Sequence, residues 1–276
     1  MGPILALFTL TLRQLVLSPK IGFALLLAVV PGTLAVIVRL AAGWQSGSRD
    51  IWEFYHAAGQ VLSLQIIVPV LCMVYGTALI GAEVEARTFV YLTTRHMRRG
   101  TVLLVKYVAA ALLLTALAEG MVVLFHVCHL GGRAPGFLPA VPTGVAWHPA
   151  NDLMTLLIAA PLGVVTFLAV FTLIGLLTAR PLALSVLYLV IIELAFGNLP
   201  LEARVYCVSH LIRKMMAGRI AGMRGFYELS QELWDTVYLG GLPVWCGILG
   251  VILVTLGFAV VLVSTRELLP AKMVRE

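Results

Sequence analysis

Long uninterrupted runs of apolar residues, separated by short polar stretches, dominate this chain. A helix needs roughly 20 apolar residues to cross a bilayer, and six runs meet that length: residues 21–40, 61–82, 102–127, 153–179, 181–199 and 244–265. The runs are continuously apolar rather than alternating, which predicts helices and not the strands of a barrel. The fourth and fifth runs meet at Arg180 and Pro181, which predicts a tight turn with the proline opening the next helix.

Two features of the backbone are predicted at finer scale. Pro31, Pro69 and Pro161 lie inside apolar runs and predict kinks or local unwinding there. Residues 1–20 are a shorter amphipathic stretch, which predicts a helix lying in the membrane interface and broken at Ser18 and Pro19. A simple extension of the first spanning helix is the alternative for this stretch.

The segment between the fifth and sixth runs, residues 200–243, is too long for a plain connector. Leu211 and Met215 fall on one side of a predicted helix over residues 208–216, with Arg213 and Lys214 on the other. A second acidic and aromatic stretch covers residues 228–238. We expect short helices that rest on the membrane or dip into it, and the alternative is a helical hairpin outside the membrane.

Composition and charge set the protein class. Hydrophobic residues make up 61% of the chain, charged residues 12%, and the mean hydropathy is +1.02. Soluble domains carry about 25% charged residues, so we predict an all-α integral membrane protein that forms a single transmembrane domain over residues 1–276. If both ends are cytoplasmic, eleven of the nineteen Lys and Arg residues face inward, and this favours that orientation. The net charge of +6 fits contact with anionic membrane lipid and does not require nucleic acid.

Charged residues gather between the second and third apolar runs. Glu83, Glu85 and Arg87 begin a segment over residues 83–101 that continues through Arg95, Arg98 and Arg99, with Lys106 just beyond. Charge this dense cannot lie in hydrocarbon, so the segment must emerge from the membrane. A compact segment of mixed charge is a good docking surface for another protein. The alternative is that these charges only end two helices and satisfy the Lys and Arg asymmetry.

No common catalytic signature is present: the chain contains no G-x-x-x-x-G-K-[ST], no H-E-x-x-H and no G-x-S-x-G. The candidates that remain are polar groups inside the apolar runs, namely Glu119, His126 and Glu193. An intramembrane carboxylate is a functional candidate by default, and the alternative is a protonated carboxyl that joins two helices by a hydrogen bond. If Glu119 and Glu193 relay protons, the chain is a self-contained secondary transporter.

The spacing of His and Cys residues also allows two further sites, for which the signal is weaker. His126 lies two helical turns beyond Glu119, and His129 follows one turn later, so a metal site at these three residues, or an enzymatic site at Glu119 and His126, is an option. Cys128 and Cys207 fall near the predicted outer face, where a disulfide is allowed.

The charged segment resembles a known family. The run Gly81-Ala82-Glu83-Val84-Glu85-Ala86-Arg87-Thr88, followed by Tyr91-Leu92, Arg95, Arg98-Arg99-Gly100 and Lys106-Tyr107, is similar to the permease subunits of type-2 ABC exporters. Arg87 stands where that family usually has glycine, and His96 stands about where it has proline. The layout of an interfacial helix, six spans and short outer helices before the last span also resembles the family.

The resemblance implies a transport subunit of a bacterial cytoplasmic (inner) membrane that is not itself an enzyme. Two ABC-type ATPase subunits would dock beneath two permeases, either a homodimer or a related heterodimer. The chain itself would hold no cofactor, because ATP and Mg²⁺ bind the ATPase. Phe89, Tyr91 and Leu92 would anchor the contact, and the full docking set implied is Glu83, Glu85, Arg87, Thr88, Phe89, Tyr91, Leu92, Arg95, Arg98, Arg99 and Lys106.

Overall fold

The computed structural model describes residues 2–42, 54–79, 98–130, 149–178, 180–197, 207–217 and 244–265, and within these ranges the chain is helical without strands. The predicted all-α class is therefore confirmed for the described residues. The α-helices are α1 (Pro3–Leu17), α2 (Lys20–Ala42), α4 (Val68–Gly76), α7 (Arg99–Leu130), α8 (Pro149–Leu177), α9 (Pro181–Tyr188), α10 (Val208–Ala217) and α13 (Val244–Thr265). Two π-helical segments, η1 (Ala57–Ile67) and η3 (Leu189–Phe196), continue directly into or from α-helices.

Five helices of the described chain are long and apolar enough to cross a membrane: Lys20–Ala41, Phe54–Gly76, Arg99–Leu130, Pro149–Leu177 and Val244–Thr265. They make this a multi-pass helical membrane protein. The prediction of six full-length spans is corrected at the fifth run, residues 181–199, which forms only the short helix Pro181–Phe196. This helix opens at Pro181 as expected. It ends at Gly197, where the backbone nitrogen bonds to the Ile192 carbonyl and the helix closes.

The second predicted span is displaced along the sequence. It begins at Phe54 and not at residue 61, so His56 and Gln60 belong to the same continuous helix. Its first part is π-helical, and α-helical geometry resumes at Val68 and Pro69. The Val68 nitrogen still bonds five residues back, to the Ser63 carbonyl. Pro69 has no N–H to continue the ladder, and the change from π- to α-helix falls at this proline. Pro31 and Pro161 lie inside the uninterrupted helices α2 and α8, so the predicted unwinding does not occur at these two prolines.

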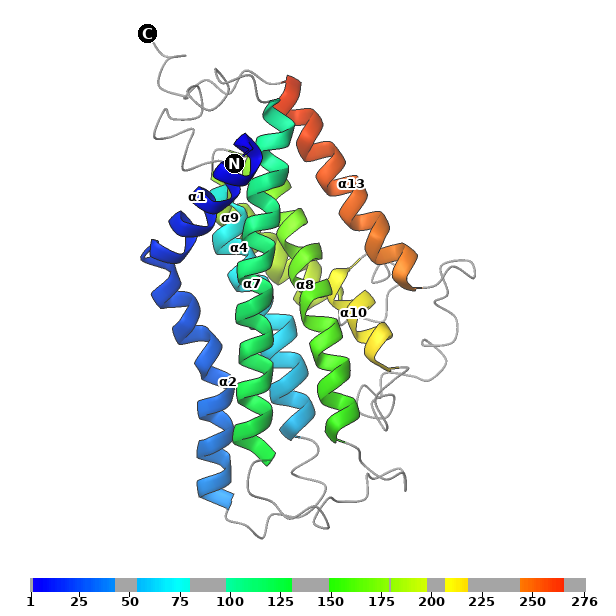
Figure 1. Cartoon of the computed structure of the whole chain (residues 1–276). Helices are drawn as coiled ribbons and strands as arrows, with labels where there is room; N and C mark the ends of the chain where they lie inside the picture. Colours follow the sequence, from blue (N-terminus) through cyan, green and yellow to red (C-terminus); the bar gives the residue numbers. More distant parts are fainter. Residues whose placement is uncertain are drawn as a thin grey trace.

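From α2 to α8 the long helices run in alternating directions, and α13 runs in the same direction as α8 (Figure 1). Gly100, at the start of α7, lies against Val260 near the end of α13. We call this end of the bundle the Arg99 end. At the other end, the Arg39 guanidinium near the end of α2 bonds to the Cys128 carbonyl near the end of α7. We call this the Asp152 end, because α8 starts here.

Glycine brings α4 and α8 into close contact near the Arg99 end. A Cβ atom added to Gly76 would lie 3.0 Å from the Phe171 Cβ, and one added to Gly175 would lie 3.0 Å from the Thr77 carbonyl oxygen. Only glycine allows these two backbones to approach so closely, as in other small-residue contacts between membrane helices. The two helices therefore form a tightly packed pair at the centre of the core.

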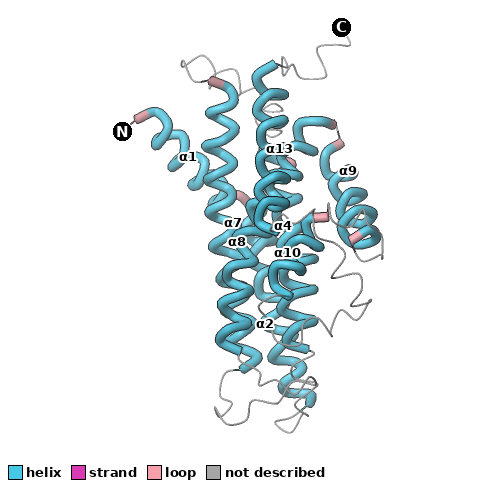
Figure 2. The backbone as a smooth tube through the Cα atoms, turned by 90° about the vertical axis from the view of Figure 1, so that its right-hand side faces the viewer, coloured by secondary structure: helices cyan, strands magenta, loops and turns pink. Residues whose placement is uncertain are grey.

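The amphipathic N-terminal stretch forms α1 and ends at Ser18, as predicted. It packs on α7 and buries Leu7 and Thr11, while most of its other side chains are exposed. Figure 2 shows α1 projecting at an angle from the bundle of long helices. The helix is thus separate from α2, and the alternative of one continuous first span is not supported.

The predicted helix over residues 208–216 is confirmed as α10, and it lies between α8 and α13 (Figure 1). A Cβ atom on Gly163 would lie 3.3 Å from the Ile212 Cδ1 atom, and Gly163 is at the middle of α8. Thus α10 dips to the middle of the bundle, and a position outside the membrane does not fit it. The second expected helix, residues 228–238, lies outside the described residues. We call residues 181–197 and 207–217 together the hairpin.

Candidate functional site

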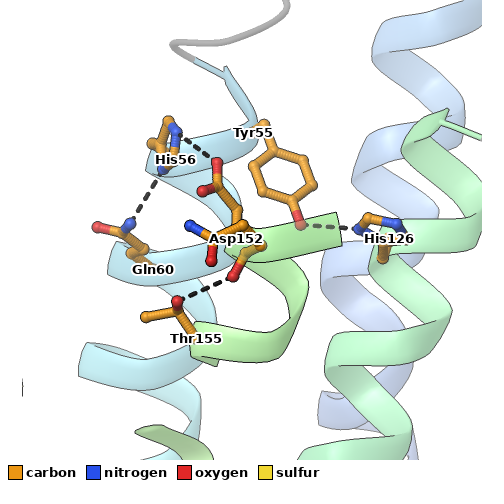
Figure 3. Close-up of polar contacts among 7 residues, drawn as sticks. Tyr55, His56, Gln60, His126, Asp152 and Thr155 are labelled. Atoms are coloured by element: carbon orange, nitrogen blue, oxygen red, sulfur yellow. Dashed lines mark hydrogen bonds and ion pairs between the residues drawn. The ribbon is translucent and has the colours of Figure 1, made fainter. Parts of the chain in front are cut away.

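A group of polar side chains, all buried except the half-buried His126, lies at the Asp152 end (Figure 3). They come from three helices: the start of the Phe54–Gly76 helix, the end of α7 and the start of α8. We call them the polar cluster, and its members are Tyr55, His56, Gln60, His126, Asp152 and Thr155. Buried polar groups in membrane helices are expensive and mark functional positions by default, so this cluster is the candidate functional site.

His56 connects two helices of the cluster. Its Nε2 lies 3.5 Å from Asp152 Oδ2, and the two side chains are 1% and 2% exposed. The Gln60 amide nitrogen lies 3.0 Å from His56 Nδ1. An amide N–H can only donate, so Nδ1 is the acceptor and the proton of the neutral ring lies on Nε2, which faces Asp152. A proton on this ring is therefore directed at the buried carboxylate.

Tyr55 connects the same helix to α7. Its hydroxyl forms a hydrogen bond with His126 Nδ1 at 2.8 Å. Its ring centroid lies 5.3 Å from that of Phe125 and 5.6 Å from that of His129, distances at which aromatic pairs contribute about 0.5–1.5 kcal/mol. Phe125 and His129 are themselves stacked, with 5.8 Å between centroids. Aromatic packing thus shields the polar cluster on the α7 side.

The structure separates the predicted polar residues of α7. His126 joins the polar cluster through Tyr55 and His129 lies under the Tyr55 ring, whereas Glu119 is half-buried and has no hydrogen bond or ion pair within the described residues. No set of three His, Cys, Asp or Glu side chains in the described ranges is arranged to hold a metal ion. The option of a metal site at Glu119, His126 and His129 is therefore not supported.

Glu193, the other predicted intramembrane carboxylate, binds the start of α10. Its Oε1 accepts from the Tyr188 hydroxyl at 2.6 Å and the Val208 N–H at 3.1 Å. Its Oε2 accepts from the Ser209 N–H at 2.9 Å and the Ser209 hydroxyl at 2.7 Å. These contacts make Glu193 a carboxyl group that joins two helices by hydrogen bonds, as the structural alternative for this residue requires. Glu193 serves as an N-cap supplied from another helix.

Other contacts close the same hairpin. The buried Arg213 guanidinium donates to the Gly197 carbonyl, and the Cys207 thiol donates to the Ile192 carbonyl at 3.3 Å. Burial and the neighbouring Glu193 carboxylate raise the pKa of Cys207 to about 11, against the lowering effect of Arg213. Cys207 therefore stays a thiol at neutral pH. Cys128 and Cys207 are both free, so the disulfide left open by the sequence is not formed.

Most of the predicted docking residues, from Glu83 to Arg95, lie outside the described residues. Arg98 is exposed, and its carbonyl accepts from the Thr101 and Val102 nitrogens at 2.9 and 3.2 Å, which starts α7. Arg99 is half-buried. Lys106 is 4% exposed and faces the bundle interior. Of the described members of the docking set, Arg98 is thus the one fully available to a partner.

Tyr55, His56, Gln60 and Asp152 are not predicted from the sequence, because the second span is expected to start at residue 61 and the fourth at residue 153. One signal was present: His56 and Gln60 are four residues apart, which places them on one face of a helix. A second signal was Asp152, three residues after Pro149 and so in the first turn of the next helix.

Comparisons with protein-family models, with curated proteins and with solved structures found no match to this chain.

Proposed function

We propose that this chain is the membrane permease subunit of an ATP-driven type-2 ABC exporter, in the cytoplasmic membrane of a bacterium and with both ends in the cytoplasm. The sequence resemblance at residues 81–107 motivates the proposal. The observation that carries it is the position of the two ends that flank the charged segment. Thr77 and Leu79, before the segment, and Gly100, after it, belong to the same Arg99 end of the bundle.

This position suits a single docking face. At the Arg99 end of the bundle, α7 begins and the helices α4, α8 and α13 terminate. The first part of α7 also carries α1, which packs on it. An ATPase bound to residues 83–98 would therefore act on several helices at once. Its closure on ATP would move them as a body, a common form of transporter switching. In this proposal Lys106, being buried, holds the permease together and does not touch the ATPase.

The polar cluster has a role in the same proposal. It ties the Phe54–Gly76 helix to α7 and α8 at the end away from the docking face. These contacts would keep the far end closed in the resting state and separate when the docked end moves. A second permease copy would complete the transporter, and the transport path would lie between the two permease subunits.

A proton-coupled secondary transporter is the second candidate, now favoured by the buried His56–Asp152 pair and less by Glu119 and Glu193. Glu193 is saturated by four hydrogen bonds, and Glu119 has no described partner from which to relay a proton. Under this alternative the purified chain alone, sealed in vesicles, dissipates an imposed pH gradient, and Asp152→Asn stops it. Under the exporter proposal the chain alone does not dissipate the pH gradient.

Copurification from native membranes tests the exporter proposal. The tagged chain should bring down a subunit that carries a Walker motif, and the complex should hydrolyse ATP in nanodiscs. Phe89→Ala or Tyr91→Ala should weaken ATPase binding by about 30-fold, because truncation of a central aromatic anchor costs about 2 kcal/mol. Phe258→Ala, on the exposed face of α13, is the matched control and should change nothing. If replacement of residues 89–95 leaves ATPase binding intact, the proposal is wrong.

Orientation is tested separately by thiol labelling in intact cells. Single cysteines at positions 48 and 98 are introduced after the four native cysteines have been replaced. A membrane-impermeant reagent should label position 48 and spare position 98. The reverse pattern would invert the proposed orientation.

A further inference from the structure

An apolar groove runs between α1 and the first half of α7. Its volume is about 550 Å³, within the range of roughly 300–1,000 Å³ typical of small-molecule sites. Ile4, Leu5 and Phe8 form one wall, and Leu104, Val108 and Leu112 form the other. All of its lining residues are apolar or glycine, so the groove fits hydrocarbon and offers no polar group to a hydrophilic ligand.

The environment above the groove is positive. Arg98 is exposed and immediately precedes α7, seven residues before Val105, another lining residue, so it lies at the end of α7 that carries the groove. The first turns of α1 and α7 contain no acidic residue. Helix N-termini carry partial positive charge, and Gly2 and Ile4, at the start of α1, line the groove. A ligand with a hydrocarbon chain and an anionic head matches this combination.

The length of the site matches one leaflet of a bilayer. Fourteen residues separate Arg98 from Leu112, which is about 21 Å along a helix that rises about 1.5 Å per residue. Half of a bilayer, headgroups included, is also roughly 21 Å. An amphiphile whose head lies at Arg98 and whose chain reaches Leu112 therefore has the dimensions of a single membrane phospholipid.

We propose that this groove binds one anionic phospholipid of the surrounding bilayer, with its phosphate at Arg98 and one acyl chain between α1 and α7. The proposal rests on the membrane character of the protein and not on the exporter function. The bound lipid would fill the groove beside the contact between α1 and α7, and would help to hold the N-terminal helix against the bundle.

Native mass spectrometry of the purified protein tests the proposal. Delipidated protein is titrated with phosphatidylglycerol or phosphatidylcholine, and wild type should retain one phosphatidylglycerol in preference. Arg98→Ala should reduce that preference about fivefold, the effect of one basic residue near the membrane surface. Arg180→Ala, an exposed arginine in the turn before α9, is the matched control and should leave the preference unchanged.

A bulky side chain placed in the groove tests whether the groove binds the acyl chain of the lipid. Val108→Trp should abolish retention of the tightly bound lipid, whereas Leu253→Trp, on the exposed face of α13, should not. Equal retention of both lipids by wild type would overturn the charge assignment. Unchanged lipid retention in Val108→Trp would show that the groove holds something other than lipid. The same conclusion would follow if Val108→Trp disrupted a dimer of the chain and left lipid retention intact.

Discussion

Two carboxylates of this protein, Asp152 and Glu193, are each 2% exposed, yet they are held in different ways. Glu193 accepts four hydrogen bonds, from Tyr188 in its own helix and from the first residues of α10. Asp152 faces His56 across 3.5 Å, and His56 belongs to another long helix. The first carboxylate stabilises a local hairpin, whereas the second links two helices that are distant in sequence.

The difference indicates which contact can open. Separation of Glu193 from α10 leaves the backbone N–H groups of Val208 and Ser209 and the Ser209 hydroxyl without this acceptor in a buried place, and each such group costs about 1–3 kcal/mol. Separation of Asp152 from His56 breaks a longer and weaker contact. A transporter that changes shape without unfolding needs contacts of the second kind at its moving ends, so the polar cluster suits motion and the hairpin suits rigidity.

The largest expected effect comes from Glu193→Ala. It removes the acceptor of four hydrogen bonds and should lower the free energy of unfolding by about 3 kcal/mol or more. The measurement is denaturant unfolding in mild detergent, with amide hydrogen exchange at Val208 and Ser209 as the local readout. The stability of Glu193→Gln should fall between those of wild type and Glu193→Ala. The glutamine oxygen can still accept hydrogen bonds, but its NH₂ group faces donors and cannot accept from them. If Glu193→Ala leaves exchange at these amides unchanged, the cap is not what holds α10.

Asp152→Ala should have a smaller effect on stability, about 1–2 kcal/mol, because it breaks one long-range contact. A double-mutant cycle with His56→Ala isolates the pair. We expect a coupling energy of about 1 kcal/mol, measured by the same unfolding assay. Asp152→Asn is the control that keeps the side-chain shape. Strictly additive effects of the two substitutions would mean that His56 and Asp152 do not interact.

The smallest effect is expected for Tyr55→Phe, which removes only the hydroxyl that bonds to His126. Polar contacts between membrane helices average about 0.6 kcal/mol, and the ring packing on Phe125 remains. Tyr188→Phe is the matched comparison, and it should cost more, about 1.5 kcal/mol, because its acceptor is the Glu193 carboxylate. Equal losses for the two tyrosines would remove the distinction between the two carboxylates.

Much of the fold follows from apolar run length. The helix 244–265 was predicted to the residue, and α1, its end at Ser18 and α10 were predicted from side-chain periodicity and from Ser and Pro signals. The short fifth helix was not, because residues 181–199 are apolar enough to span, and what shortens the helix is the closure at Gly197 and the binding of Glu193 to α10. That contact is tertiary and leaves no local pattern.

The polar cluster was harder to predict from the sequence, for a related reason. Hydropathy places a span where residues are most apolar, so polar residues at the start of a helix, such as His56 and Gln60, are assigned to the loop. Their burial depends on Asp152, which lies on another helix and almost a hundred residues from His56 along the chain. His126 was singled out as an ionisable group within an apolar run, but its partner Tyr55 was not.

The glycine contact between α4 and α8 has a mechanical consequence. With backbones touching at Gly76 and Gly175, the two helices cannot slide or separate at this point, so the contact acts as a pivot near the Arg99 end. From Leu177 to Asp152, α8 is about 38 Å long at roughly 1.5 Å per residue. A force applied just beyond Leu79 that tilts one helix against the other by a few degrees therefore becomes a displacement of ångströms at the far end, where His56 meets Asp152.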